Sequence, residues 1–79
     1  MLVVQVSPRK KIYVSVEPDN GNNKGGYFCQ MYWDEQKEFF IDSFTISRFD
    51  IPNGLTEKEK YNKAMVLANW KAKAKYENG

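Results

Sequence analysis

The sequence predicts an α+β fold, in which an antiparallel meander of three to four strands is followed by one long C-terminal helix packed on the sheet. Two observations lead to this prediction. Residues 2–46 contain short stretches of β-branched and aromatic residues, separated by turn-forming Pro, Gly and Asn. From Leu55 onward the apolar residues recur at helical spacing instead. Strands followed by a helix are typical of the α+β class, and residues 1–79 are expected to form a single small domain.

Four segments are expected to form strands. The first is mostly β-branched and the second nearly alternates, and each ends beside a proline, Pro8 or Pro18, which cannot donate to a strand ladder. The third is aromatic and alternating, and a polar turn of Asp, Glu, Gln and Lys separates it from the fourth. The expected strands cover residues 2–6, 11–16, 27–33 and 38–46.

The segment between the second and third strands, residues 20–26, reads NGNNKGG and raises the question of a phosphate-binding loop. A Walker A loop requires G-x-x-x-x-G-K-[ST] between a strand and a helix. Here Lys24 precedes the glycine pair, no Ser or Thr follows it, and a strand comes next. Asn-Gly and Gly-Gly supply the positive φ angles that hairpin connections require. We therefore interpret this segment as a flexible hairpin loop.

The start of the helix is marked by a capping box, with Thr56 as the N-cap and Glu59 as the third helical residue. The helical pattern continues to about Tyr76, and Asn78-Gly79 is expected to end it. At about 100° per residue, the helix has two apolar stripes. One contains Tyr61, Ala64, Met65, Ala68 and Ala72, with Tyr76 at its edge, and the other contains Val66, Trp70 and Ala74, with Leu67 adjacent.

A sheet can cover only one of these stripes, so two interpretations of Trp70 remain open. In the first, Trp70 packs over the sheet edge or against the N-terminal segment. In the second, it is left exposed for a partner, because a tryptophan rimmed by lysines such as Lys63 and Lys73 is typical of a binding hot spot. Such a tryptophan is equally a stacking platform for nucleic acid.

The sheet poses the same question, because both of its faces carry large apolar groups. The second face is covered by the first strands or by the loop around Phe49 and Ile51, or it is a docking surface. The third strand alternates Tyr27, Cys29, Met31 and Trp33 with Phe28, Gln30 and Tyr32, and the fourth alternates Phe40, Phe44 and Ile46 with Phe39 and Ile41.

The composition argues against catalysis and metal binding. The chain has no histidine, the commonest general base, and its one cysteine excludes an internal disulfide and a Cys/His zinc site. Cys29 lies among aromatic residues in a predicted strand, so we expect an inert buried thiol. We therefore expect no enzyme activity and no catalytic, cofactor or metal site. A lone free thiol and the lack of any apolar run of ~20 residues predict a cytoplasmic protein without membrane contact.

The function favoured by these features is that of a small protein-binding module. Its net charge is only +2, and aromatic residues make up 15% of the chain. We expect a protein partner, and a homodimer joined through the uncovered face is an alternative. In size and style the chain resembles the accessory proteins of phages and mobile elements, many of which inhibit a host enzyme or a defence complex by occupying its surface. The residues expected to contact the partner are Trp70, Val66, Leu67, Lys63, Lys73, Tyr32 and Trp33.

The alternative function is nucleic-acid binding through a three-stranded sheet. Residues 26–79 resemble the arm-binding domains of phage integrases, with Ser43-Phe44 near the end of the last strand and Thr56-Glu57 opening the helix. Two features depart from that family. The segment 46–54 is an insertion before the helix, and the strands and their turn carry Asp and Glu where the family favours Arg and Lys. Acidic groups on a reading face repel phosphate, and the only tight basic run is residues 9–11.

Overall fold

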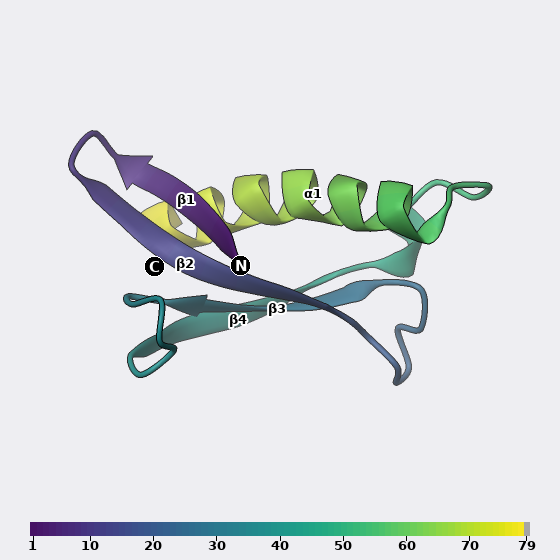
Figure 1. The fold of residues 1–79 in the computed structure, drawn as a ribbon, viewed down its shortest axis with the longest axis horizontal. Coiled ribbons are helices and arrows are strands. Elements are labelled where there is room, and N and C mark those ends of the chain that lie inside the picture. Colours follow the sequence, from purple (N-terminus) through teal and green to yellow (C-terminus); the bar gives the residue numbers. More distant parts are fainter. Residues whose placement is uncertain (79) are drawn as a thin grey trace.

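The computed structural model describes residues 1–78 and shows the predicted α+β fold (Figure 1). Each strand pairs antiparallel with the preceding one, which gives the sheet order β1-β2-β3-β4. The segment expected to be a loop after the fourth strand contains one 3-10 turn, where the Ser47 hydroxyl accepts from the Phe49 N–H (3.1 Å). The elements are β1 (Leu2–Ser7), β2 (Lys10–Pro18), β3 (Tyr27–Tyr32), β4 (Phe40–Ile46), η1 (Arg48–Asp50) and α1 (Glu57–Asn78).

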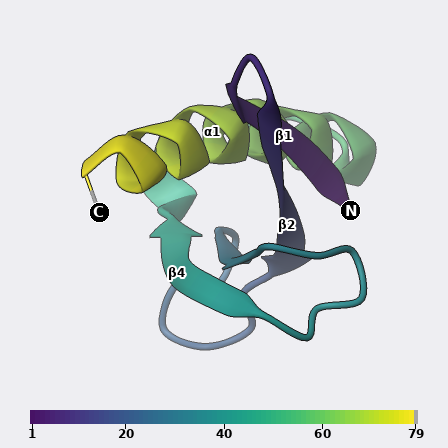
Figure 2. The ribbon, with the colours of Figure 1, turned by 90° about the vertical axis from the view of Figure 1, so that its left-hand side faces the viewer.

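The helix covers one face of the sheet, as the end-on view shows (Figure 2). Ala64, Ala68 and Ala72 are fully buried, and their small side chains let the helix approach the strands closely. The stripe that contains these alanines is therefore the core stripe, which answers the choice that the sequence left open. Alternate residues of the strands complete the core from below, namely Val4, Ile12, Val14, Val16, Tyr27, Cys29, Met31 and Ile46.

The loop between β2 and β3 joins two antiparallel strands, as expected, but it is anchored to a distant part of the chain. The Asn23 side chain donates from Nδ2 to the Ile46 carbonyl oxygen (2.9 Å) and accepts at Oδ1 from the Arg48 backbone N–H (2.9 Å). Gly26 makes this close approach possible, because a Cβ there would collide with the Ile46 carbonyl and the Arg48 nitrogen. The sequence predicted a hairpin loop, and the structure adds a long-range contact through Asn23 that the sequence did not predict.

A β-bulge in β4 changes the face on which two of its residues lie. Tyr32 pairs with Phe40, but Met31 pairs with Asp42, so Ile41 is an extra residue on the β4 side. As a result Phe40 lies on the face opposite Phe44 and Ile46, and Ile41 packs against the core. The sequence alternation had grouped Phe40 with Phe44 and Ile46, and that grouping is wrong because one inserted residue reverses the side-chain alternation.

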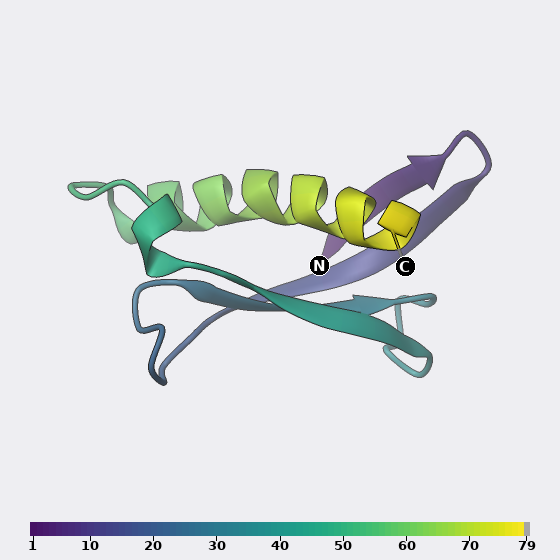
Figure 3. The same cartoon turned by 180° about the vertical axis from the view of Figure 1, so that it is seen from behind.

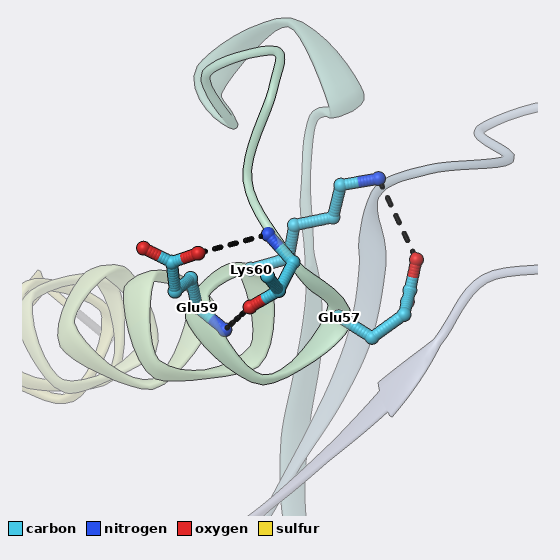
Figure 4. A network of polar contacts seen from close by, with 4 residues as sticks. Glu57, Glu59 and Lys60 are labelled. Atoms are coloured by element: carbon cyan, nitrogen blue, oxygen red, sulfur yellow. Dashed lines mark hydrogen bonds and ion pairs between the residues drawn. The ribbon is translucent and has the colours of Figure 1, made fainter.

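The predicted capping box is present at the start of α1 (Figure 4). The Glu59 N–H donates to the Thr56 hydroxyl (3.2 Å), and the Thr56 N–H donates to Glu59 Oε1 (3.0 Å). The hydrogen bond from the Thr56 N–H also lowers the pKa of Glu59. The helix continues to Asn78, and Gly79, the expected stop, lies outside the described residues. Within residues 1–78, no helix combines the length and apolar character that crossing a bilayer requires.

Candidate protein-interaction surfaces

The first candidate surface is the outward side of α1. Val66 and Trp70 lie one turn apart, and 54% and 70% of their respective surfaces are exposed. The interpretation in which Trp70 packs over the sheet edge is therefore wrong. Leu67, which was grouped with them, packs instead against the core. On the same side of the helix, Lys63 is exposed and Lys73 is half-buried.

Trp33 belongs to a different place, the end of the sheet next to the last turns of α1. Its ring meets Tyr76 edge-on at a centroid distance of 6.0 Å. The Lys10 ammonium lies 4.3 Å from the Trp33 ring centroid, a cation–π contact from the start of β2. These contacts hold Trp33 in a structural cluster, although 42% of its surface remains exposed.

The second candidate surface is the face of the sheet that the helix does not cover. Strand pairing places four large side chains directly beside one another across all four strands, because Val3 pairs with Tyr13, Tyr13 with Tyr32 and Tyr32 with Phe40. We call this line of residues the aromatic row. Figure 3 shows the molecule from behind, with β4 as an outer strand beneath the helix.

The aromatic row is buried at Tyr32 and exposed at its ends. Tyr32 is 8% exposed, donates from its hydroxyl to Gln30 Oε1 (3.1 Å), and meets Phe40 edge-on at 5.9 Å. Val3 and Phe40, on the two outer strands, are 50% and 54% exposed. The buried, hydrogen-bonded Tyr32 ring is pre-organised for contact, because it loses little side-chain freedom on binding.

Apart from the partly exposed Phe28, the rest of this face is mostly polar and almost uncharged. The next row pairs Ser15 with Gln30 and Gln30 with Ser43, and the row beyond it contains Glu17, Phe28 and Thr45. Lys11 and Glu17 are the charged side chains that the pairing places on this face within β2, and their charges cancel. An apolar patch with a neutral polar surround is typical of protein–protein interfaces.

The predicted contact residues therefore fall in three separate places. Lys63, Val66, Trp70 and Lys73 lie on the outer side of the helix, Tyr32 lies on the opposite surface of the molecule, and Trp33 lies at one end. Sequence reasoning missed Val3 and Tyr13 as parts of a surface. Their alternation with the buried Val4, Ile12 and Val14 was the available signal.

The thiol and the carboxylates were the other candidates for reactive chemistry in the sequence. Cys29 is fully buried, and burial raises the pKa of its thiol to about 11. Among the described residues, no group of three or more His, Cys, Asp or Glu side chains is arranged to hold a metal ion. Comparisons of the chain with protein-family models, with curated proteins and with solved structures found no match.

Proposed function

We propose that this protein is a non-enzymatic protein-binding module that docks through the helix-free face of its sheet. The observation that carries this proposal is the aromatic row of Val3, Tyr13, Tyr32 and Phe40, which crosses all four strands on the face opposite the core and is half-exposed at Val3 and Phe40. A sheet face of this kind is stabilised by a second apolar layer, and here that layer comes from the partner.

The module acts by occupying its partner's surface. The contact blocks whatever the partner normally binds there, which is how a small accessory inhibitor of a host enzyme or defence complex works. The buried, unpaired Cys29 supports a reducing compartment such as the cytoplasm as the place of action. The outward pair Val66 and Trp70 lies on the other side of the molecule, so it cannot belong to the same flat contact.

Affinity capture with two matched double variants tests this proposal. The tagged protein is exposed to nuclease-treated host lysate, and bound proteins are identified by mass spectrometry. We expect one stoichiometric partner that is lost with Val3→Ser/Phe40→Ser and kept with Val66→Ser/Trp70→Ser. Circular dichroism spectra establish that both variants are folded. Loss with Val66→Ser/Trp70→Ser alone would show that the partner docks on the helix instead. Binding that survives in both variants would refute the proposal.

Nucleic-acid binding is the second candidate function, and one observation favours it. Tyr13 and Phe40 present rings on an open sheet, where bases of a single strand can stack. The cancelling charges of Lys11 and Glu17 on the same face favour a protein partner instead. If the nucleic-acid function is correct, affinity for DNA or RNA falls steeply with salt, and neutralising Arg9, Lys10 and Lys11 together weakens it.

A further inference from the structure

A basic pocket lies at the end of the strands opposite the aromatic row. It has a volume of about 280 Å³, and three cationic side chains from three different elements line it. Lys24 comes from the β2–β3 loop, Arg48 from η1 and Lys60 from the first turns of α1. None of the side chains that line this pocket is acidic. Like charges gathered in one pocket repel one another, and a bound anion relieves that repulsion.

Hydrogen bonds anchor the backbone segments that carry Lys24 and Arg48. The two side-chain hydrogen bonds of Asn23, which we call the Asn23 clamp, join the loop that carries Lys24 to the Ile46 carbonyl oxygen and the Arg48 N–H. Arg48 Nη1 also donates to the Asn22 carbonyl oxygen (3.2 Å), so a neutral group positions the guanidinium. Within residues 1–78, neither Lys24 nor Arg48 has a carboxylate within 4.0 Å. Their charges are therefore available to a ligand.

An exposed aromatic ring adjoins the three cations. Phe49 also lines the pocket, and 82% of its surface is exposed, the largest fraction among the large apolar residues described. The Arg48 guanidinium carbon lies 4.8 Å from the centroid of the Phe49 ring, on one side of it. The ring thus lies beside the basic pocket and can stack with a second flat group.

We propose that this pocket binds a nucleotide, with the phosphate held by Lys24, Arg48 and Lys60 and the base stacked on Phe49. Guanidinium and ammonium groups bind phosphate through charge-assisted hydrogen bonds, and an aromatic ring stacks with a base whatever its sequence. The nucleotide is either free or part of a single strand, because the chemistry recognised is the same. The site is independent of the proposed protein contact, which uses the other end of the strands.

One carboxylate near the pocket competes with the ligand. Glu57 Oε1 lies 3.6 Å from Lys60 Nζ, and its side chain is 91% exposed (Figure 4). Asp19 lines a neighbouring pocket that shares Lys24 and Lys60, and its Oδ1 accepts from the Gly21 N–H. Removing the charge of Glu57 frees Lys60, so Glu57→Gln is expected to tighten nucleotide binding a few-fold, whereas neutralising the lysines weakens it.

Titrations followed by backbone amide NMR at low salt test the proposal. The probes are AMP, inorganic phosphate and a short single-stranded oligothymidylate. We expect AMP to shift the amides of Gly25, Arg48 and Phe49, and to bind more tightly than phosphate alone. Lys24→Gln/Lys60→Gln should weaken AMP binding by roughly tenfold or more, and Phe49→Leu by a smaller factor. The matched control Lys37→Gln/Lys58→Gln removes the same charge from outside the pocket and should change little.

Each outcome supports or overturns the proposal. Tighter binding of the oligonucleotide than of AMP identifies a strand as the source of the ligand, and equal binding identifies a free nucleotide. Equal affinity for phosphate and AMP would overturn the assignment of a nucleotide. The absence of localised shifts at millimolar AMP, or equal weakening by the control pair, would overturn the site itself. The phosphate and AMP results do not bear on the aromatic row, and the amides that shift show whether the oligonucleotide binds at the pocket or at the row, so failure here is distinguishable from failure of the protein-binding proposal.

Discussion

Cys29 is the residue whose ionisation is most clearly coupled to the stability of the fold. Burial raises its pKa from an ordinary 9.0 to about 11, and Lys71 lowers it only in part. Well below pH 9 both the native and the unfolded chain hold the thiol proton. The contribution of Cys29 to the free energy of unfolding is therefore fully present there. As the pH rises from 9 to 11 the unfolded chain releases the proton and the native chain keeps it, which stabilises the unfolded state.

We therefore predict that the free energy of unfolding falls between pH 9 and pH 11 by about 2–3 kcal/mol more in the natural chain than in Cys29→Ala. Burial also raises the pKa of Tyr27, but Tyr27 is present in both proteins and cancels in the comparison. Guanidinium unfolding curves at several pH values measure the difference. Parallel pH profiles for the two proteins would contradict the prediction.

The two tryptophans should respond differently to truncation. Trp33 packs against Tyr76 and lies beneath the Lys10 ammonium, whereas 70% of the surface of Trp70 is exposed. We expect Trp33→Ala to lower the free energy of unfolding by about 1–3 kcal/mol and Trp70→Ala to change it by less than about 0.5 kcal/mol. Chemical denaturation followed by circular dichroism checks both values. A large loss with Trp70→Ala would mean that Trp70 belongs to the core.

At the scale of the element, the capping box determines where α1 begins. Thr56 and Glu59 satisfy each other's backbone N–H groups, and the first turn also contains Glu57, whose charge favours a helix N-terminus. We predict that Thr56→Ala lowers the free energy of unfolding by about 1 kcal/mol. The exposed Lys58→Ala in the same turn is the control, and it should have a much smaller effect. Equal losses in the two variants would show that the cap contributes little.

The strands show where local pattern determines structure and where it does not. Alternation located all four strands and identified Tyr27, Cys29 and Met31 as one face, because a one-sided core imposes a two-residue period. It failed at Phe40, because a bulge adds one residue and no feature of composition marks its position. The sequence therefore predicted which residues of the third strand share the core face, but it did not predict that Phe40 lies on the opposite face.

At the scale of the whole molecule, the fold class follows from the sequence, but the choice of core stripe in α1 and the two proposed sites do not. The aromatic row requires the register of three strand pairs, and periodicity does not specify register. The basic pocket requires Lys24, Arg48 and Lys60 to meet, and they are far apart along the chain. The clamp formed by Asn23 brings the first two together through a contact that no local pattern encodes.

The packing of α1 on β1 also affects how the chain can fold during its synthesis. The helix packs more extensively on β1 than on any other strand, although the rest of the sheet separates them in sequence. On a translating ribosome, the apolar side of β1 emerges early and stays uncovered until the helix follows. The nascent chain therefore passes through a stage in which Leu2, Val4 and Val6 are open to chaperones, and it completes its core only when the helix is free of the exit tunnel.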